Sequence, residues 1–149
     1  MSYVRTLAFD RHRAVVSAAL ALVVNLALLR AGDLAGASFL VPDRSAEGAL
    51  MQVGLVPVVL STLVPLAAGL VLTALIRARW PRALPALHAL AVLVTLASLA
   101  MPLSTGTDTG TRVVLAVMHL VVGAAYLAAT RPAGTAARTA RRPDVERAR

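Results

Sequence analysis

Cysteine and lysine are both absent from the 149-residue sequence. Without a thiol, the chain can form no disulfide, no thiolate nucleophile and no Cys-ligated metal site. A small four-helix membrane oxidoreductase that exchanges thiols and disulfides is therefore excluded. Because lysine is missing, all 15 basic residues are Arg. Together with the abundance of Ala, Val and Leu, this indicates a high-GC bacterial genome, and we expect the protein in a bacterial cell membrane.

Charged residues are also absent from four long apolar stretches. Each stretch is close to or above the roughly 20 residues with which one helix crosses a hydrocarbon core of about 30 Å. None has a polar face wide enough to meet water, which argues against a soluble bundle. The sequence therefore predicts an all-α membrane protein, an antiparallel four-helix transmembrane bundle over residues 14–130. We expect its helices at about 14–32, 49–76, 83–101 and 111–130.

The Arg residues are distributed unevenly between the two sides of this bundle. Twelve of them lie in residues 1–13, in the loop 77–83 or after residue 130, and three lie in the other two loops. This positive-inside asymmetry predicts that both termini are cytoplasmic. Residues 1–13 then form a cytoplasmic leader and residues 131–149 a basic cytoplasmic tail. The tail has almost no apolar content, so we expect it to be disordered.

The net charge of +8 raises the question of an acidic partner. No aromatic residues that stack on bases accompany the Arg of the tail, so we expect no nucleic acid partner. The partners expected from the sequence are the lipid bilayer and anionic lipids of the inner leaflet. Each Arg near such a leaflet adds roughly 1 kcal/mol to the attraction. The tail could instead serve only to fix the topology.

The first apolar stretch also resembles a secretory signal peptide. It follows an Arg-rich start and precedes Ala35-Gly36-Ala37, which is similar to a cleavage site. Arg30 and Asp33 lie between the stretch and that site, and the later helices need a first helix to pack against. We therefore assign it as a transmembrane helix.

Two prolines, Pro57 and Pro65, lie in the second predicted helix. An internal proline lacks an N–H and crowds the carbonyl four residues before it, so each predicts a bend. Neighbouring hydroxyl groups such as those of Ser61 and Thr62 can hydrogen-bond a carbonyl freed in this way. The bend serves either packing or a hinge.

Catalytic and metal-binding patterns are missing from the apolar stretches. They contain no Asp or Glu, which argues against a proton-coupled drug exporter, and no catalytic set or phosphate loop is present. We therefore predict no enzyme and no cofactor. Two histidines, His88 and His119, raise the question of a haem. Counted from the flanking Arg, they differ in depth by about 10 Å, which does not suit two ligands of one upright haem.

Polar side chains gather at two depths of the predicted bundle. Roughly 18–22 Å from the cytoplasmic edge lies a candidate outer polar layer of Asn25, Ser61, Thr62, Thr95 and His119. Roughly 6–9 Å from that edge lies a second layer of Ser17, Thr73, His88 and Tyr126. The layers either only join helices by hydrogen bonds, or the outer one lines a pocket that opens outward, with His119 as its titratable group. In that pocket we expect the His119 ring to hydrogen-bond with Asn25, Ser61 or Thr62.

Two short motifs resemble a known family. Gly32-Asp33-Leu34 follows the first helix, and Met118–Ala124, read MHLVVGA, lies in the fourth. Over about Ala14–Ala129 the chain is similar to the domain of unknown function 6069 family of small actinobacterial integral membrane proteins. The resemblance implies four helices in an actinobacterial membrane, and no activity, ligand or cofactor comes with it.

The function expected from these observations is that of a non-enzymatic scaffold or interaction protein, with a membrane-protein partner or a second copy of the chain. The alternative is a small-molecule binder or transporter that uses a polar pocket around His119. A solid core lined by small residues would favour the scaffold. A cavity that reaches His119 would favour the binder.

Overall fold

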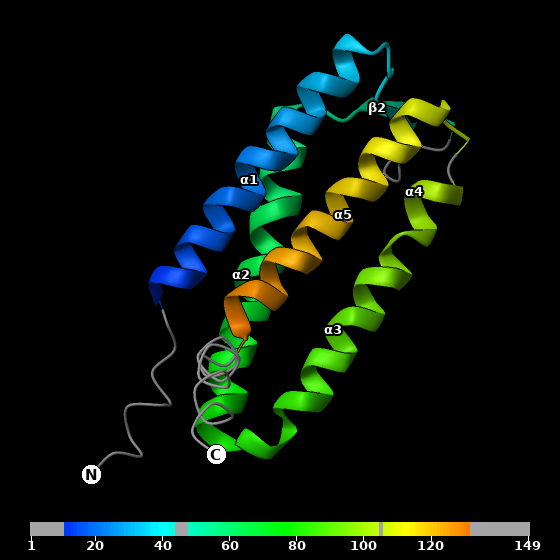
Figure 1. Ribbon diagram of the computed structural model, residues 1–149. Coiled ribbons are helices and arrows are strands. Elements are labelled where there is room, and N and C mark those ends of the chain that lie inside the picture. The colour runs from blue at the N-terminus through cyan, green and yellow to red at the C-terminus, as the bar shows by residue number, and fades with distance from the viewer. Residues whose placement is uncertain (1–10, 44–47, 105, 132–149) are drawn as a thin grey trace, which may run out of the picture.

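The computed structural model describes residues 11–43, 48–104 and 106–131. The expectations for the first ten residues and for the tail after residue 131 lie outside these ranges. Within them, four helical segments are long and apolar enough to cross a membrane: α1 (Arg11–Leu34), α2 (Leu55–Arg79), the segment Pro81–Ser104 and α5 (Thr109–Thr130). Consecutive segments run in opposite directions (Figure 1). The chain is therefore an all-α, multi-pass membrane protein built on a four-helix bundle.

The third segment is divided into the 3-10 turn η2 (Pro81–Ala83), α3 (Leu84–Ser98) and α4 (Ala100–Ser104). We expected Pro102 to end this helix at residue 101, but helical residues continue beyond it. The chain tightens just before the proline, where the N–H of Leu99 donates to the carbonyl of Leu96 at 3.2 Å. Pro102 consequently lies in the first turn of α4, where a missing N–H is tolerated.

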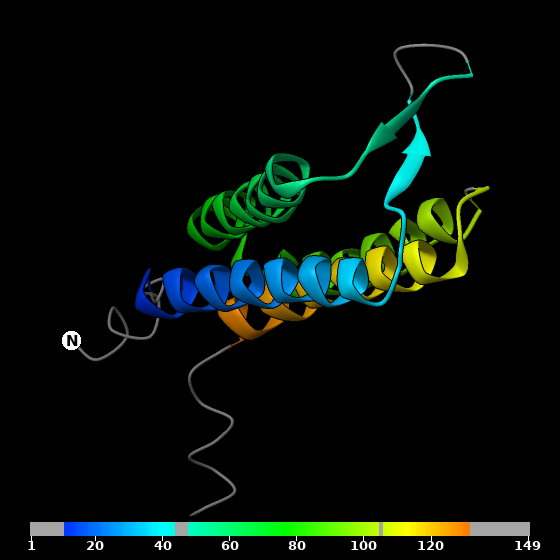
Figure 2. The ribbon, with the colours of Figure 1, turned by 90° about the horizontal axis from the view of Figure 1, so that it is seen from above.

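The second helix begins six residues later than predicted, because residues 49–54 do not join it. β1 (Leu40–Pro42) pairs antiparallel with β2 (Leu50–Gln52), with Val41 opposite Met51. This pairing satisfies backbone groups that would otherwise need a helix. The hairpin extends away from the helices at the end where α1 stops (Figure 2). We call this end of the bundle the hairpin end, and the opposite end, where α1 begins, the Arg end.

The later start of α2 changes the role of its first proline. Pro57 now lies in the first turn, where it removes no helical hydrogen bond, so the expected internal position is wrong. Pro65 lies inside the helix, as expected. A bend at Pro65 stays a prediction.

Helix α5 lies at the centre of the bundle, in contact with α1, α2 and α3. Figure 1 shows it between α1 and α3. Gly123 on α5 lets α3 approach closely, because a Cβ there would collide with the Thr95 side chain. On α2, a Cβ at Gly69 would lie 3.1 Å from the ring of Tyr126. In contrast, α2 and α3 have few direct contacts, so the bundle is open between them.

Large apolar side chains cover the outward faces of the helices. On α1, for example, Val15, Leu20 and Val23 are each at least 60 % exposed. In water such surfaces would be unstable, whereas the hydrocarbon of a bilayer accommodates them.

At the hairpin end, Asp108 joins α5 to the loop that follows α1. Its carboxylate accepts hydrogen bonds from Ser38 Oγ at 2.6 Å, from Thr111 N at 2.8 Å and from Thr111 Oγ1 at 2.6 Å. These hydrogen bonds, that of Ser38 first, hold the pKa of the Asp108 carboxyl well below its ordinary value. The same residue caps the N-terminus of α5, where a negative charge is favourable.

Phe39 fixes the loop between α1 and β1. Its backbone N–H donates to Thr111 Oγ1 at 2.9 Å, and it adopts a positive φ of 51°. The ring is buried against Leu29 and Met118. A Cβ at Gly32 would lie 2.6 Å from its Cζ atom, so the motif at residues 32–34 needs its glycine to make room for this ring.

At the Arg end, arginines from two other helices hold the last turn of α5. Arg13 donates to the carbonyls of Ala128 at 3.0 Å and Arg131 at 3.2 Å, and Arg77 donates to the carbonyl of Thr130 at 3.4 Å. Cations are favourable at the negative end of a helix dipole. These contacts also show that both ends of the described chain, residues 11 and 131, lie at the same end of the bundle.

Candidate functional site

A cavity of about 470 Å³ lies between α2, α3 and α5, with one side chain from α1 in its wall. This volume falls in the range of about 300–1,000 Å³ that is typical of small-molecule sites. Its wall on α5 consists largely of apolar residues such as Leu115, Met118 and Val122. No Asp, Glu or Arg contributes to the lining.

The cavity opens toward the side of the bundle. Its lining residues on α1 and α5 are buried or half-buried, whereas several on α2 and α3 are exposed. Leu72 on α2 is 45 % exposed, and Leu90 and Val94 on α3 are 52 % and 57 % exposed. The mouth therefore runs between α2 and α3, which have few direct contacts with each other. We expected a polar pocket open toward the outer face; the structure instead has a mainly apolar cavity with a lateral mouth.

All five residues of the predicted outer layer line this cavity: Asn25, Ser61, Thr62, Thr95 and His119. One hydrogen bond joins two helices within this set, from Asn25 Nδ2 to Thr62 Oγ1 at 2.8 Å. Both side chains are almost completely buried, at 2 % and 1 % exposure. The other amide atom, Asn25 Oδ1, is buried without a hydrogen-bond partner. Such an atom carries a desolvation cost that a bound donor would remove.

His119 has a different partner from the one we expected. Its Nδ1 atom lies 2.7 Å from the carbonyl of Leu115, one turn earlier on α5. In the described chain it forms no hydrogen bond with Asn25, Ser61 or Thr62. The backbone carbonyl is close because a side chain on a helix can reach the residue four positions before it. A carbonyl only accepts, so Nδ1 carries the hydrogen and Nε2 of the neutral ring is an acceptor.

Three of the four residues of the second layer come together near the Arg end. Thr73 donates to the carbonyl of Gly69 at 2.8 Å, so the hydroxyl of Tyr126, 2.7 Å away, must donate to Thr73. The ring of His88 lies edge-on to that of Tyr126, with centroids 6.3 Å apart. Ser17 is half-buried on α1 and takes no part in this network.

Thr130 completes the network, and sequence reasoning missed it. Its hydroxyl donates to the carbonyl of Tyr126 at 2.9 Å, so it accepts its 3.1 Å hydrogen bond from Nε2 of His88. His88 thus carries its hydrogen on Nε2 and His119 on Nδ1. The signal for Thr130 was its position one turn after Tyr126. Its position next to Arg131, at the end of the helix, is one where a polar residue is ordinary.

The two histidines weighed above as haem ligands each bond to an oxygen atom of the protein. In residues 11–43, 48–104 and 106–131, no group of three His, Cys, Asp or Glu side chains could hold a metal ion. His88 bonds to Thr130 and His119 to Leu115, so each histidine already uses one nitrogen within the protein. His88 does not line the cavity.

The motifs that resemble a known family have structural roles at this site and at the hairpin end. Met118 and Gly123 line the cavity, and Gly32 accommodates Phe39. A family model described as "Family of unknown function (DUF6069)" matches residues 5–136. No curated protein and no solved structure matches the chain. The matched segment contains all four membrane-spanning segments, and the chain belongs to the DUF6069 family.

Proposed function

We propose that this membrane protein is a non-enzymatic binder of a small, mainly apolar molecule, which occupies the cavity between α2, α3 and α5. The single observation that carries the proposal is the cavity itself, about 470 Å³ in volume and reaching His119. A protein that only packs against partners has no need of such a space, since close packing is what stabilises helix association in a membrane. Carriage of the molecule across the membrane would be an extension of the same site.

The lateral mouth supports entry from the bilayer. Its rim side chains, among them Leu72, Leu90 and Val94, are apolar and exposed. A lipid-soluble molecule can pass between them without leaving hydrocarbon. A charged ligand is disfavoured, because the lining offers no Asp, Glu or Arg to pair with it.

Photolabelling in vesicles tests this proposal. The full chain is reconstituted, and a diazirine-bearing alkane in the bilayer is activated to insert into nearby C–H bonds. We expect adducts on Met118 and Val122, which line the cavity on α5, in addition to those on Val23 at the lipid-facing surface. Met118 is only 5 % exposed, so the probe can reach it only through the cavity.

Two matched alanines on α3 provide the variants. Ala91 lines the cavity, whereas Ala89 is exposed and does not. Ala91→Phe should fill the cavity and reduce adducts on Val122 without changing those on Val23. Ala89→Phe should change neither. If Val122 is not labelled, or is labelled equally in both variants, the binder proposal fails and the scaffold or homo-oligomer proposal is favoured.

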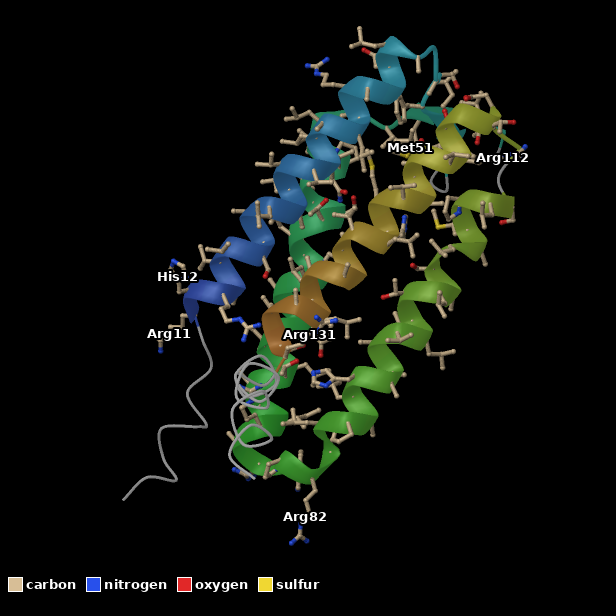
Figure 3. All side chains as sticks on the ribbon, viewed as in Figure 1. Arg11, His12, Met51, Arg82, Arg112 and Arg131 are labelled. Atoms are coloured by element: carbon tan, nitrogen blue, oxygen red, sulfur yellow. The ribbon has the colours of Figure 1, made fainter. Side chains whose placement is uncertain are left out.

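For orientation, we propose that the Arg end is cytoplasmic. In the described chain this end holds Arg11, Arg82 and Arg131, while Arg112 lies at the hairpin end (Figure 3). A bacterial cell membrane, with anionic inner-leaflet lipids near the basic tail, is the location that this orientation supports. A reporter active only outside the cytoplasm should be silent when it is fused after Arg149, and activity there would reverse the orientation.

A further inference from the structure

The polar hydrogens on the cavity wall are mostly used within the protein. Ser61, Thr95 and Ser98 donate their hydroxyl hydrogens to carbonyls of their own helices, at 3.3, 2.8 and 2.7 Å. Tyr126 donates to Thr73, as shown above. These residues therefore present oxygen lone pairs to the cavity and few free donors.

His119 adds an acceptor to this wall. The bond from Nδ1 to the carbonyl of Leu115 fixes both the tautomer and the ring position. Nε2 then has a lone pair, and no described residue donates to it. The ring is half-buried and lines the cavity, so a bound molecule can reach this nitrogen.

Asn25 adds a second polar group without a partner. Its Oδ1 atom is buried and unbonded, while its Nδ2 atom is bonded to Thr62. Thr62 can donate as well as accept, so a 180° turn of the amide would present the NH₂ group instead. A hydroxyl group on the bound molecule that gives its one hydrogen to another acceptor can still accept a hydrogen bond from this NH₂ group.

We propose that the molecule bound in the cavity is an uncharged, mainly apolar alcohol or phenol whose hydroxyl donates a hydrogen bond to Nε2 of His119. This inference rests on the proposed function and adds the chemical class of the ligand. An ether or ketone of the same size would bring only a further acceptor to a wall that already has an excess of acceptors. A carboxylate or phosphate would in addition bring a charge that the apolar wall cannot compensate.

A matched series of probes tests the inference by competition with the photoreactive alkane. The probes are 1-dodecanol, 1-methoxydodecane and n-tridecane, compared at equal mole fraction in the bilayer, with Val122 adducts as the readout. We expect dodecanol to compete about fivefold more effectively than the ether. One additional hydrogen bond raises affinity by a net factor of about five. We expect the ether and the alkane to compete about equally.

Two variants test whether the preference for dodecanol over the ether comes from a hydrogen bond to Nε2 of His119. His119→Phe should abolish the advantage of dodecanol while the ether still competes. His88→Gln is the matched control, since His88 lies outside the cavity and Gln can still donate to Thr130. In the ¹⁵N spectrum of histidine-labelled protein, dodecanol should shift Nε2 of His119, and the ether should not.

The outcomes separate the two proposals. If all three probes compete equally, the proposed binding function still stands, but the inference of a ligand hydroxyl is wrong. A dodecanol preference that survives His119→Phe, or an unshifted Nε2 signal, would also overturn it. If no probe competes and the photoreactive alkane does not label the cavity residues, the proposed function itself is wrong.

Discussion

Two polar regions of the bundle have similar side chains and opposite states of hydrogen bonding. Near the Arg end, Thr73, Tyr126, Thr130 and His88 form a chain of hydrogen bonds in which each hydroxyl has a partner. At the cavity, Asn25 Oδ1 is unbonded and Nε2 of His119 has no donor. The first region is a structural contact between helices, and the second is the site of the proposed ligand.

The separation between α2 and α3 accounts for this difference. The two helices are joined by the short turn around η2, which brings both against the last turns of α5. Away from this turn the two helices diverge (Figure 1). Polar groups near the turn find partners on neighbouring helices, whereas those farther away face a cavity.

The largest effect is expected where α3 and α5 meet in the wall of the cavity. Gly123→Val should destabilise the protein by about 3 kcal/mol or more, because the new side chain overlaps Thr95. Thermal unfolding in detergent, followed by helical circular dichroism, measures this loss. Adding Thr95→Ala should recover part of it, since the pair is coupled. Gly54→Ala is the control, because nothing lies within 4 Å of a Cβ there, and a loss of similar size in it would contradict the explanation.

A moderate effect is expected in the bonded region. Thr73→Val keeps the shape of the side chain but leaves the buried Tyr126 hydroxyl without its acceptor, at a cost of about 1–2 kcal/mol. Tyr126→Phe should cost only about 0.6 kcal/mol, because Thr73 keeps its bond to the carbonyl of Gly69. The same unfolding measurement compares the two variants. Equal costs would mean that the direction of the Tyr126 hydrogen bond is assigned wrongly.

A smaller effect is expected at the hairpin end, where Asp108 ties the loop to α5. Hydrogen bonds from Ser38 and Thr111 lower its pKa, so the folded state binds a proton less readily than the unfolded state. The stability from this contact is therefore complete above the ordinary carboxyl pKa of about 4 and is lost as the pH falls toward the lowered value. Asp108→Asn should lower the unfolding temperature at pH 7 and remove this part of the acid dependence. An unchanged acid profile in the variant would contradict this role.

The smallest effect is expected in the cavity. The double variant Asn25→Leu, Thr62→Val replaces both partners of one buried hydrogen bond and removes the unbonded oxygen, so stability should change by less than about 0.5 kcal/mol. Binding of 1-dodecanol should nevertheless weaken. A loss as large as that of Thr73→Val would show that both polar regions are structural, and the comparison would no longer hold.

The sequence by itself determined the four membrane-spanning segments, because length and lack of charge are local properties that a bilayer selects directly. It also placed the five outer-layer residues near one depth, because the rise per residue of a helix is fixed. It could not give their partners. The hydrogen-bond partner of each side chain depends on how its helix is rotated about its axis. The sequence of a helix that is apolar on all sides gives little information about that rotation.

Only the tertiary structure decided the hairpin, the cavity and the partner of His119. The strands β1 and β2 depend on a pairing between two three-residue segments, each too short to be recognised as a strand by itself. The cavity depends on α3 packing against α5 and not against α2, through the contact of Thr95 with Gly123. The ring of His119 bonds to the carbonyl of Leu115 on its own helix, a local partner that competed with the expected side chains of the other helices. Interhelical distances set the cavity, and a sequence of uniformly apolar helices does not specify those distances.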